Sequence, residues 1–196
     1  DTTPSSPERT QDLASLIQKY DRPVPRYTSY PTAVEFTEDV GADAYREALT
    51  RANARTEAPW SLYVHVPFCE KRCHFCACSV IVSPNHERVS SPYLERLLRE
   101  IDMVSALVPD RRRVAQLHLG GGTPTYLTPG QLQTLYGALL ERYEMLPGAE
   151  VAIEVDPRVT TSEHLDVLLG LGVNRVSMGV QDLDPAVQEA IGREQP

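Results

Sequence analysis

Four cysteines within ten positions are the residues of this sequence with the clearest chemistry. Cys69, Cys73, Cys76 and Cys78 form the pattern C-x3-C-x2-C-x-C, and the chain contains no other cysteine. Thiolates at such short spacing are typical of soft-metal sites and iron–sulfur clusters. A disulfide framework is disfavoured, because all four thiols are clustered in a chain that shows no export signal.

Two kinds of metal site stay open on this spacing. A structural zinc site usually joins C-x2-C to a second, distant pair of ligands, and here no second pair exists, although His65, His74 or His86 could serve as a fourth ligand. Three thiolates can instead hold three irons of a four-iron cluster, which leaves the fourth iron free for a substrate or cofactor. The spacing favours the cluster, with zinc as the alternative.

Three further motifs follow strand-like segments: GGGTPT at 120–125, EVDP at 154–157 and MGVQD at 178–182. Glycines allow the backbone to approach a ligand closely, although a tight turn would explain a glycine triplet equally well. Glu154 lies on the same strand face as Ala152. A buried carboxylate needs a partner, and an ion pair with Arg158 or Arg175 is the simplest candidate.

Strand and helix patterns alternate around these motifs. Strands are expected at 61–66, 114–119, 151–155 and 174–180, and helices at 92–108, 128–143, 161–172 and 184–192. Strand then helix, four times over, predicts an α/β fold with parallel strands. Because the carboxyl ends of parallel strands meet at one edge, the cysteines and the three motifs are expected to converge.

The amino-terminal part has a different character. Helices are expected at 11–19 and 41–55, and the prolines between them predict an extended arm at 21–36. We therefore divide the chain into 1–55, with the amino-terminal helices and arm, and 56–196, with the strand–helix units.

Composition limits the classes of function. A formal charge of −8, with RRR at 111–113 as the one dense basic run, argues against nucleic-acid binding. No apolar run approaches the roughly 18 residues of a membrane span. The sequence begins without the basic and apolar blocks of a signal peptide, so a cytoplasmic location is expected.

Together the motifs resemble the radical S-adenosylmethionine (SAM) enzymes and, more narrowly, the oxygen-independent coproporphyrinogen III oxidases. The resemblance is carried by RYTSYPTA at 26–33, LYVHVPFCEKRCHFCAC, HLGGGTPT, EVDPR, NRVSMGVQD and GREQ. It implies a partial (β/α) barrel of the radical SAM type, here its first four strand–helix units, preceded by an extended amino-terminal arm that covers the site.

The resemblance also implies roles for single residues. Cys69, Cys73 and Cys76 would ligate a [4Fe–4S] cluster, and Cys78 would be an extra catalytic cysteine. Two SAM molecules are implied, the first contacted by Tyr63, Gly121 and Glu154, the second by Phe75, Gly122, Thr123, Gln181 and Arg193. Without the resemblance, Tyr63 is a barrel-interior aromatic, Phe75 an apolar loop anchor, Cys78 a small partly buried residue and Arg193 a surface residue.

The implied reaction converts two propionates of coproporphyrinogen III to vinyl groups, giving protoporphyrinogen IX in haem biosynthesis. A 5'-deoxyadenosyl radical would remove a hydrogen atom, and carbon dioxide and one electron would then leave. Arginine suits carboxylate pairing, so the arm is expected to bind propionate through Arg22, Arg26, Tyr27 and Tyr30. A monomer served by an unidentified electron donor is expected.

Two alternatives remain. A related haem chaperone shares the three-cysteine motif but lacks the extra cysteine and the RYTSYP arm, and a zinc-stabilised binding module would have no catalysis. Four strand–helix units do not close a barrel, so this chain is expected to be inactive alone and to expose an unpaired sheet edge and an apolar sheet face.

Overall fold

The computed structural model describes residues 13, 15–21 and 32–195, which fall into two compact units, 1–41 and 42–196. In the first unit, residues 13 and 15–20 are helical, and a short 3-10 turn, η1, spans Ala33–Glu35. The predicted substrate residues Arg22, Arg26, Tyr27 and Tyr30 lie outside the described residues. The arm therefore stays a prediction.

The second unit is built on a four-stranded parallel sheet in the order β1-β4-β5-β6. Its strands are β1 (Trp60–Val66), β4 (Arg113–Gly121), β5 (Glu144–Val155) and β6 (Arg175–Met178). The predicted α/β fold with parallel strands is confirmed.

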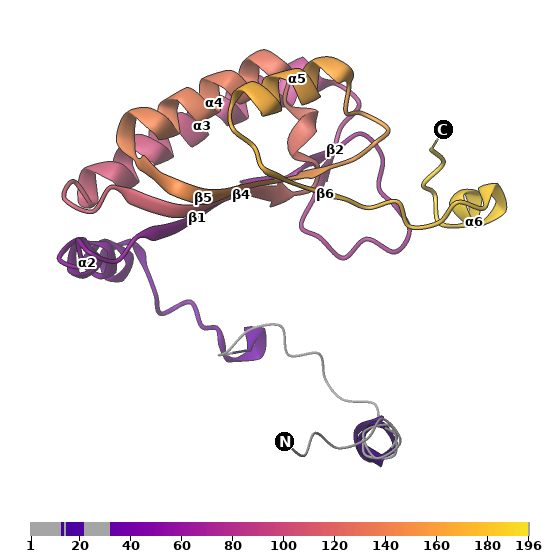
Figure 1. Ribbon diagram of the computed structural model, residues 1–196, viewed down its shortest axis with the longest axis horizontal. Helices are drawn as coiled ribbons and strands as arrows, with labels where there is room; N and C mark the ends of the chain where they lie inside the picture. The colour runs from indigo at the N-terminus through magenta and orange to yellow at the C-terminus, as the bar shows by residue number, and fades with distance from the viewer. Residues whose placement is uncertain (1–12, 14, 22–31, 196) are drawn as a thin grey trace, which may run out of the picture. The chain divides into compact units, whose positions relative to one another are not determined.

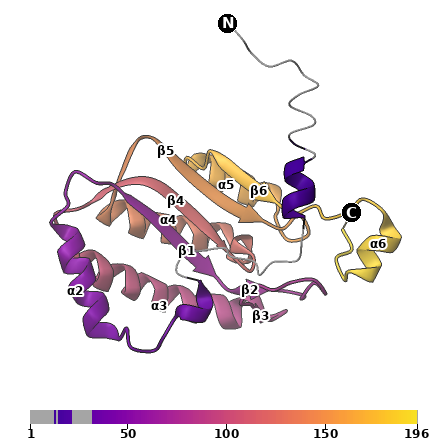
Figure 2. The same cartoon turned by 90° about the horizontal axis from the view of Figure 1, so that it is seen from below.

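Three helices, α3 (His86–Leu107), α4 (Pro129–Arg142) and α5 (Ser162–Gly170), lie on one face of this sheet (Figure 1). The opposite face is seen in Figure 2, with the helices behind it. The fourth helix, α6 (Pro185–Ala190), instead lies beyond the carboxyl end of the sheet. The last strand–helix unit thus stacks differently from the first three.

Capping side chains set where the long helices begin. Asn85 accepts a hydrogen bond from the backbone of Arg88, so α3 begins at His86, six residues before the predicted start, and Pro92 lies inside it. Thr128 with Gln131 and Thr161 with His164 form capping boxes at α4 and α5.

The hydrophobic core lies between the sheet and these helices. The side chains of Val66, Leu117 and Ile153 point to the helices and are fully buried, as the period-two pattern of the strands predicts. Each such side chain contributes about 1.5–3 kcal/mol through removal from water.

The helix before the sheet, α2 (Ala42–Asn53), packs on the α/β unit. Arg111 is buried and donates to the carbonyl groups of Ala52, Ala58 and Pro59, while its guanidinium stacks on Trp60 at 3.6 Å from the ring centre. The observed units divide before Ala42, whereas the sequence suggested a division after residue 55.

The sheet face opposite the helices is polar, so the expected exposed apolar face is confined to β6, where Val176 and Met178 are exposed. Ser61 donates to Gln116, which donates to Glu150, and Arg175 forms an ion pair with Glu150 at 2.9 Å. One polar side chain from each strand thus joins a hydrogen-bonded row across the sheet. This row satisfies groups that would be costly to leave unpaired.

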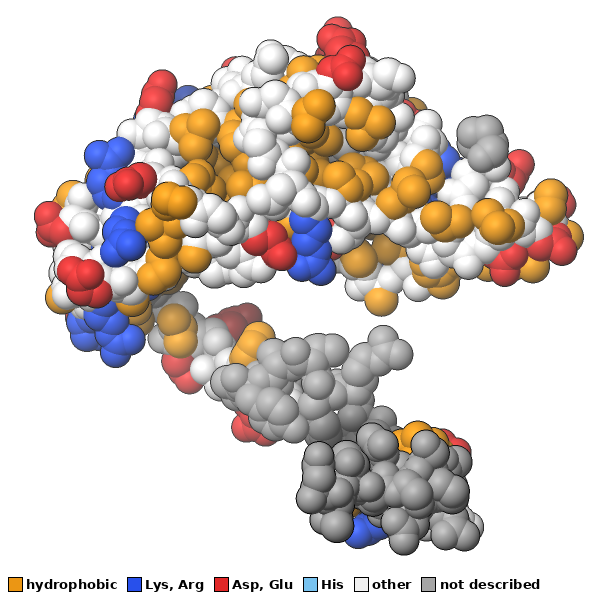
Figure 3. All heavy atoms as spheres, viewed as in Figure 1, with side chains coloured by type: hydrophobic (Ala, Val, Ile, Leu, Met, Phe, Trp, Pro, Cys, Tyr) orange, Lys and Arg blue, Asp and Glu red, His pale blue; other side chains and the backbone are white. Residues whose placement is uncertain are grey.

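The exposed apolar side chains lie at the β6 edge. Figure 3 shows apolar side chains along the side of the molecule that carries α5 and β6, where Leu169, Val176 and Met178 are more than half exposed. Within the described residues β6 pairs only with β5, as expected for an open sheet edge. In this part of the chain, no helix has the length and apolar character needed to cross a bilayer.

Candidate functional site

The cysteine loop follows β1 and is closed at its base. Two short strands, β2 (Phe68–Cys69) and β3 (Ile81–Val82), pair in parallel, and the amide of Ser83 donates to the carbonyl of Cys69 at 3.0 Å. Phe68 is buried, with its ring edge-on to Tyr93 at a centroid distance of 5.2 Å. The first ligand position is therefore anchored to the core.

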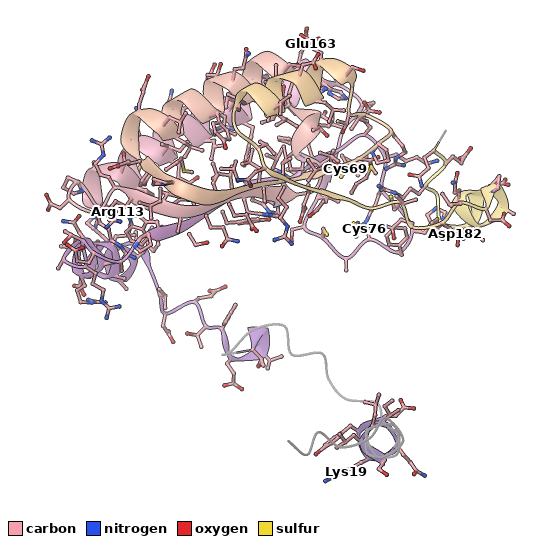
Figure 4. All side chains as sticks on the ribbon, viewed as in Figure 1. Lys19, Cys69, Cys76, Arg113, Glu163 and Asp182 are labelled. Carbon is pink, nitrogen blue, oxygen red and sulfur yellow. The ribbon has the colours of Figure 1, made fainter. Side chains whose placement is uncertain are left out.

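The far side of the loop is held by the segment after α6. The amide of His74 donates to the carbonyl of Ile191 at 2.9 Å, and Lys71 lies 3.6 Å from the Glu194 carboxylate. Figure 4 shows Cys69 and Cys76 at the end of the sheet on the side of α6. Residues far apart in the sequence thus fix one loop.

One pocket of about 390 Å³ brings nearly all the predicted site residues together. Its lining includes the four cysteines and, from the later motifs, Phe75, Gly121, Gly122, Thr123, Glu154, Gln181 and Arg193. The predicted convergence at the carboxyl ends of the strands is confirmed for these positions. Tyr63 does not line the pocket and lies beside it on the uncovered sheet face.

The cysteines differ in burial. Cys73 is buried, Cys69 and Cys76 are partly buried and Cys78 is exposed. The Cys69 sulfur lies 3.5 Å from the Thr123 hydroxyl, so this thiol faces the GGGTPT turn. Burial raises the pKa of Cys69, and the hydrogen bond with Thr123 partly offsets that rise. Burial and the neighbouring Cys76 raise the pKa of Cys78.

The cysteine spacing bears on which metal group would fit. Among the described residues, no three His, Cys, Asp or Glu side chains are grouped to hold one metal ion. A four-iron cluster makes a different demand, because each thiolate binds a different iron and the thiols surround a volume. Three thiols lining one pocket fit such a cluster, and zinc gains no support from this part of the chain.

The glycine turn approaches the cysteine loop closely. A Cβ atom on Gly122 would lie 2.7 Å from the carbonyl oxygen of Phe68 and 3.1 Å from the Cys69 sulfur. Gly121 has φ +120°, and a Cβ there would lie 2.9 Å from the His65 ring. Close approach, rather than a tight turn alone, therefore explains why glycine occupies both positions.

Glu154 has partners that differ from those suggested by the sequence. Its Oε1 lies 3.3 Å from Nε2 of His118, and its Oε2 accepts the amide of Gly121 at 3.2 Å. The suggested ion pairs with Arg158 or Arg175 are wrong, because Arg158 pairs with Asp156 and Arg175 with Glu150. Glu154 is thereby fixed at the rim of the glycine turn.

Tyr63 belongs to an aromatic group beside that carboxylate. Its ring stacks on His118 at a centroid distance of 5.8 Å, and its hydroxyl lies 2.9 Å from Nδ1 of His65. Burial raises the pKa of Tyr63, and the Glu154 carboxylate adds to this rise. Strand alternation identified Tyr63, whereas nothing local in the sequence pointed to His118, which is its neighbour on β4.

Arg193 is buried at the pocket wall, which contradicts the surface alternative. It donates to the Gly179 carbonyl at 2.8 Å and to Asp156 at 3.3 Å, and its Nε is buried without a partner within the described residues. Gln181 lines the pocket with φ +67°, and Phe75 lines it with half of its surface exposed. Arg193, Gln181 and Phe75 thus all line the cysteine pocket.

Asp156 is a site residue to which sequence reasoning assigned no role, and Arg158 was suggested only as a partner of Glu154. The Asp156 side chain is only 8% exposed, and its carboxylate meets both Arg158 and Arg193. Burial raises the pKa of Asp156, but hydrogen bonds from Arg158 outweigh that effect, so its net pKa is below the usual range. The EVDPR motif at 154–158, which begins within β5 and continues past its end, was the signal that could have found both.

A second pocket, of about 380 Å³, lies between α2, β1 and α3. Its lining is mostly apolar, with Leu49, Leu97 and Ile101 among its residues, and contains no cysteine. The cysteine pocket, which holds the thiols, is therefore the candidate functional site.

Comparison with known proteins agrees with this geometry. Residues 63–196 match the radical SAM superfamily. The chain is 47% identical over 184 residues to the oxygen-independent coproporphyrinogen III oxidase of Pseudomonas aeruginosa and 49% identical over 184 residues to that of Escherichia coli. These alignments cover 93% and 94% of this chain, but only 40% and 39% of the relatives.

A solved structure of the Escherichia coli coproporphyrinogen III oxidase, described as a radical SAM enzyme, is also similar. It superposes with a TM-score of 0.81 at 46% sequence identity, over 94% of this chain and 40% of that chain. The chain thus spans about 40% of the length of the proteins that it matches.

Proposed function

The chain belongs to the radical SAM superfamily, and from that premise we propose that it is the catalytic amino-terminal portion of an oxygen-independent coproporphyrinogen III oxidase. The protein would convert two propionate side chains of coproporphyrinogen III to vinyl groups. The observation that carries this proposal is the single pocket in which three cysteines meet the glycine turn and Glu154. Identity of 47% and 49% to named oxidases over almost the whole chain supports the substrate.

The cysteines would hold a [4Fe–4S] cluster through Cys69, Cys73 and Cys76, and SAM would bind beside it. When bound, these groups supply the one-electron chemistry needed to remove a hydrogen atom from an unactivated carbon. The protein's own role is to hold the cluster, orient SAM and enclose the reacting groups. Three thiols rather than four leave an open iron for the methionine part of SAM.

Each remaining pocket residue has a proposed part in that binding. Gly121 leaves room for the first SAM and Glu154 would accept its ribose hydroxyls, with Tyr63 alongside. Gly122, Thr123, Phe75, Gln181 and Arg193 would contact a second SAM. Cys78 lines the pocket and is exposed, which suits a role toward substrate.

In the proposed reaction, the substrate propionate loses one hydrogen atom, carbon dioxide and one electron, which leaves a vinyl group. The electron passes to an acceptor outside the chain. The arm residues Arg22, Arg26, Tyr27 and Tyr30 are proposed to bind the remaining propionates. Monomeric state and cytoplasmic location likewise remain predictions.

Anaerobic reconstitution with iron and sulfide tests the proposal, on a protein of the relatives' full length that carries this sequence, because this chain is expected to be inactive alone. We expect a brown protein with about four irons per chain, release of 5'-deoxyadenosine from SAM, and loss of two carboxyl groups from coproporphyrinogen III by mass spectrometry. Cys69→Ser should lose the cluster. A colourless zinc protein, or a brown protein that cleaves SAM but leaves coproporphyrinogen III unchanged, would contradict the proposal.

A further inference from the structure

Two arginines converge on the sulfur of Cys73. Arg158 Nη2 lies 3.6 Å from this sulfur, and Arg193 Nη1 lies 3.5 Å from it. The other thiols have different surroundings, because the Cys69 sulfur meets the neutral Thr123 hydroxyl. Within the described residues, no cationic side chain donates to the sulfur of Cys69 or Cys76. The three ligand positions are therefore electrostatically unequal.

Asp156 fixes both arginines in place. Its carboxylate accepts from Arg158 at Nε and at Nη2, at 3.0 and 2.6 Å, and from Arg193 at 3.3 Å. The Arg158 side chain is 18% exposed and that of Arg193 is 10% exposed. The fork-like contact with Arg158 is the geometry in which arginine binds a carboxylate most specifically.

The charges of this cluster do not cancel among themselves. Two guanidinium groups and one carboxylate leave one positive charge, held in a place where water has little access. Buried charge is costly unless a partner neutralises it. A Cys73 thiolate would supply that partner, and it lies within reach of both arginines.

Charge at a ligand sulfur affects the electron that a cluster accepts. Reduction adds negative charge, and hydrogen bonds to sulfur together with nearby positive charge stabilise the reduced form. On the basis of the proposed function, we propose that Arg158, held by Asp156, is a positioning residue that stabilises the Cys73 ligand and raises the cluster's reduction potential.

Arg158 tests this inference more cleanly than Arg193 does. Arg193 is also a proposed SAM contact, so its loss would mix two effects. Arg158→Gln removes the charge and leaves a shorter, neutral side chain that can still form hydrogen bonds. Arg158→Lys keeps the charge but loses the planar fork that Asp156 holds. Arg46→Gln, in an exposed pair on α2, is the matched control.

The experiment compares these full-length variants after anaerobic reconstitution. Iron content and thermal unfolding are measured without SAM. The midpoint potential of the cluster is also measured without SAM, with electron paramagnetic resonance as the readout. For Arg158→Gln we expect the ratio of reduced to oxidised cluster at a fixed potential to fall about tenfold, which is about 59 mV more negative for one electron. Arg158→Lys should shift less, and Arg46→Gln should match the wild type.

Each outcome decides the inference. A variant that unfolds normally but loses its iron supports it, because the thiolate then depends on the arginine. Full iron with a wild-type potential in Arg158→Gln overturns it, as does loss of folding in both Arg158 variants, which would make the contact structural. A wild-type chain that takes up no iron and sulfide would instead contradict the proposed function itself.

Discussion

Nδ1 of His74 lies 2.9 Å from the carbonyl oxygen of Ala190. A carbonyl only accepts hydrogen bonds, so this ring nitrogen carries a proton and donates it. Together with the backbone bond from His74 to Ile191, this contact ties the loop between Cys73 and Cys76 to the end of α6 and the turn that follows it. The cysteine loop is thus shaped partly by the last described residues of the chain.

Replacing Gly192 should loosen this tie. Gly192 has φ +66°, and a Cβ there would lie 3.0 Å from Nε2 of His74. Gly192→Ala therefore introduces backbone strain of about 1–2 kcal/mol and displaces the ring. We expect faster hydrogen exchange at the His74 amide and faster release of iron to a chelator. Unchanged exchange at His74 would show that the loop does not depend on this turn.

Gly122→Ala should disrupt the site more directly. Its Cβ would clash with the carbonyl of Phe68, which is backbone and cannot rotate away, and would press on the Cys69 sulfur. We expect most of the iron–sulfur absorption to be lost after reconstitution, because the first ligand is displaced.

Gly137→Ala is the matched control for that substitution. Gly137 lies inside α4, and a Cβ added there would meet no atom within 4 Å, so alanine should leave the cluster intact. It should also stabilise the helix by about 1 kcal/mol. Iron content and thermal unfolding of the two variants separate local clash from a general effect of replacing glycine. Equal iron content in both would refute the close-approach explanation.

Acid should weaken the fold through Asp156. Burial raises the pKa of Asp156. The hydrogen bonds from Arg158 and the nearby charge of Arg193 lower this pKa by more than burial raises it, so the net shift is downward. The carboxylate therefore adds stability above the ordinary aspartate pKa of about 3.9, and this stability is lost as pH falls through the lower folded-state value.

The apoprotein's unfolding temperature, measured from neutral pH down to the acid limit of folding, checks this. Asp156→Asn should be less stable than the wild type at neutral pH, and the difference should shrink as pH falls below about 4. A difference that stays constant over this range would mean that the charge on Asp156 does not contribute.

Much of the fold was predictable because strands and helices carry a periodic signal. Val64 and Val66 alternate with Tyr63 and His65, and this alternation correctly identified the buried and open faces of β1. The predicted start of α3 at residue 92 was wrong, because the cap at Asn85 determines where this helix begins. A helix cap depends on one side chain, so its signal in the sequence is easily hidden by a stronger signal nearby.

The site was predictable in its members but not in its contacts. Strand order brought Cys69, Thr123 and Glu154 to one edge, as parallel topology requires. Which cation meets which carboxylate depends on distances between strands, so the pairing of Arg158 with Asp156 could not be read from spacing. The polar uncovered face was missed for the same reason, since its partners come from four different strands.

The arm makes a prediction that depends on sequence alone. If Arg26 binds a substrate propionate, Arg26→Ala should raise the apparent KM for coproporphyrinogen III, by about tenfold for the loss of one charge-assisted hydrogen bond. Cluster absorption and SAM cleavage without substrate should not change. If the rate of Arg26→Ala depended on substrate concentration as the wild-type rate does, the proposal that the arm binds substrate would be wrong.

Glu154 offers the sharpest test of the proposed SAM site. Its two carboxylate oxygens are held by His118 and the Gly121 amide, so the group is fixed before any ligand binds. Glu154→Gln keeps the shape but removes the charge that would accept two ribose hydroxyls. Hydrogen bonds to charged groups contribute about 1.5–3 kcal/mol, so SAM affinity, measured by equilibrium dialysis, should fall about 10- to 100-fold. Glu150→Gln, on the same strand but in the polar row, makes the same chemical change outside the pocket and should bind SAM normally. Equal affinity in the Glu154 variant and the wild type would place the ribose elsewhere.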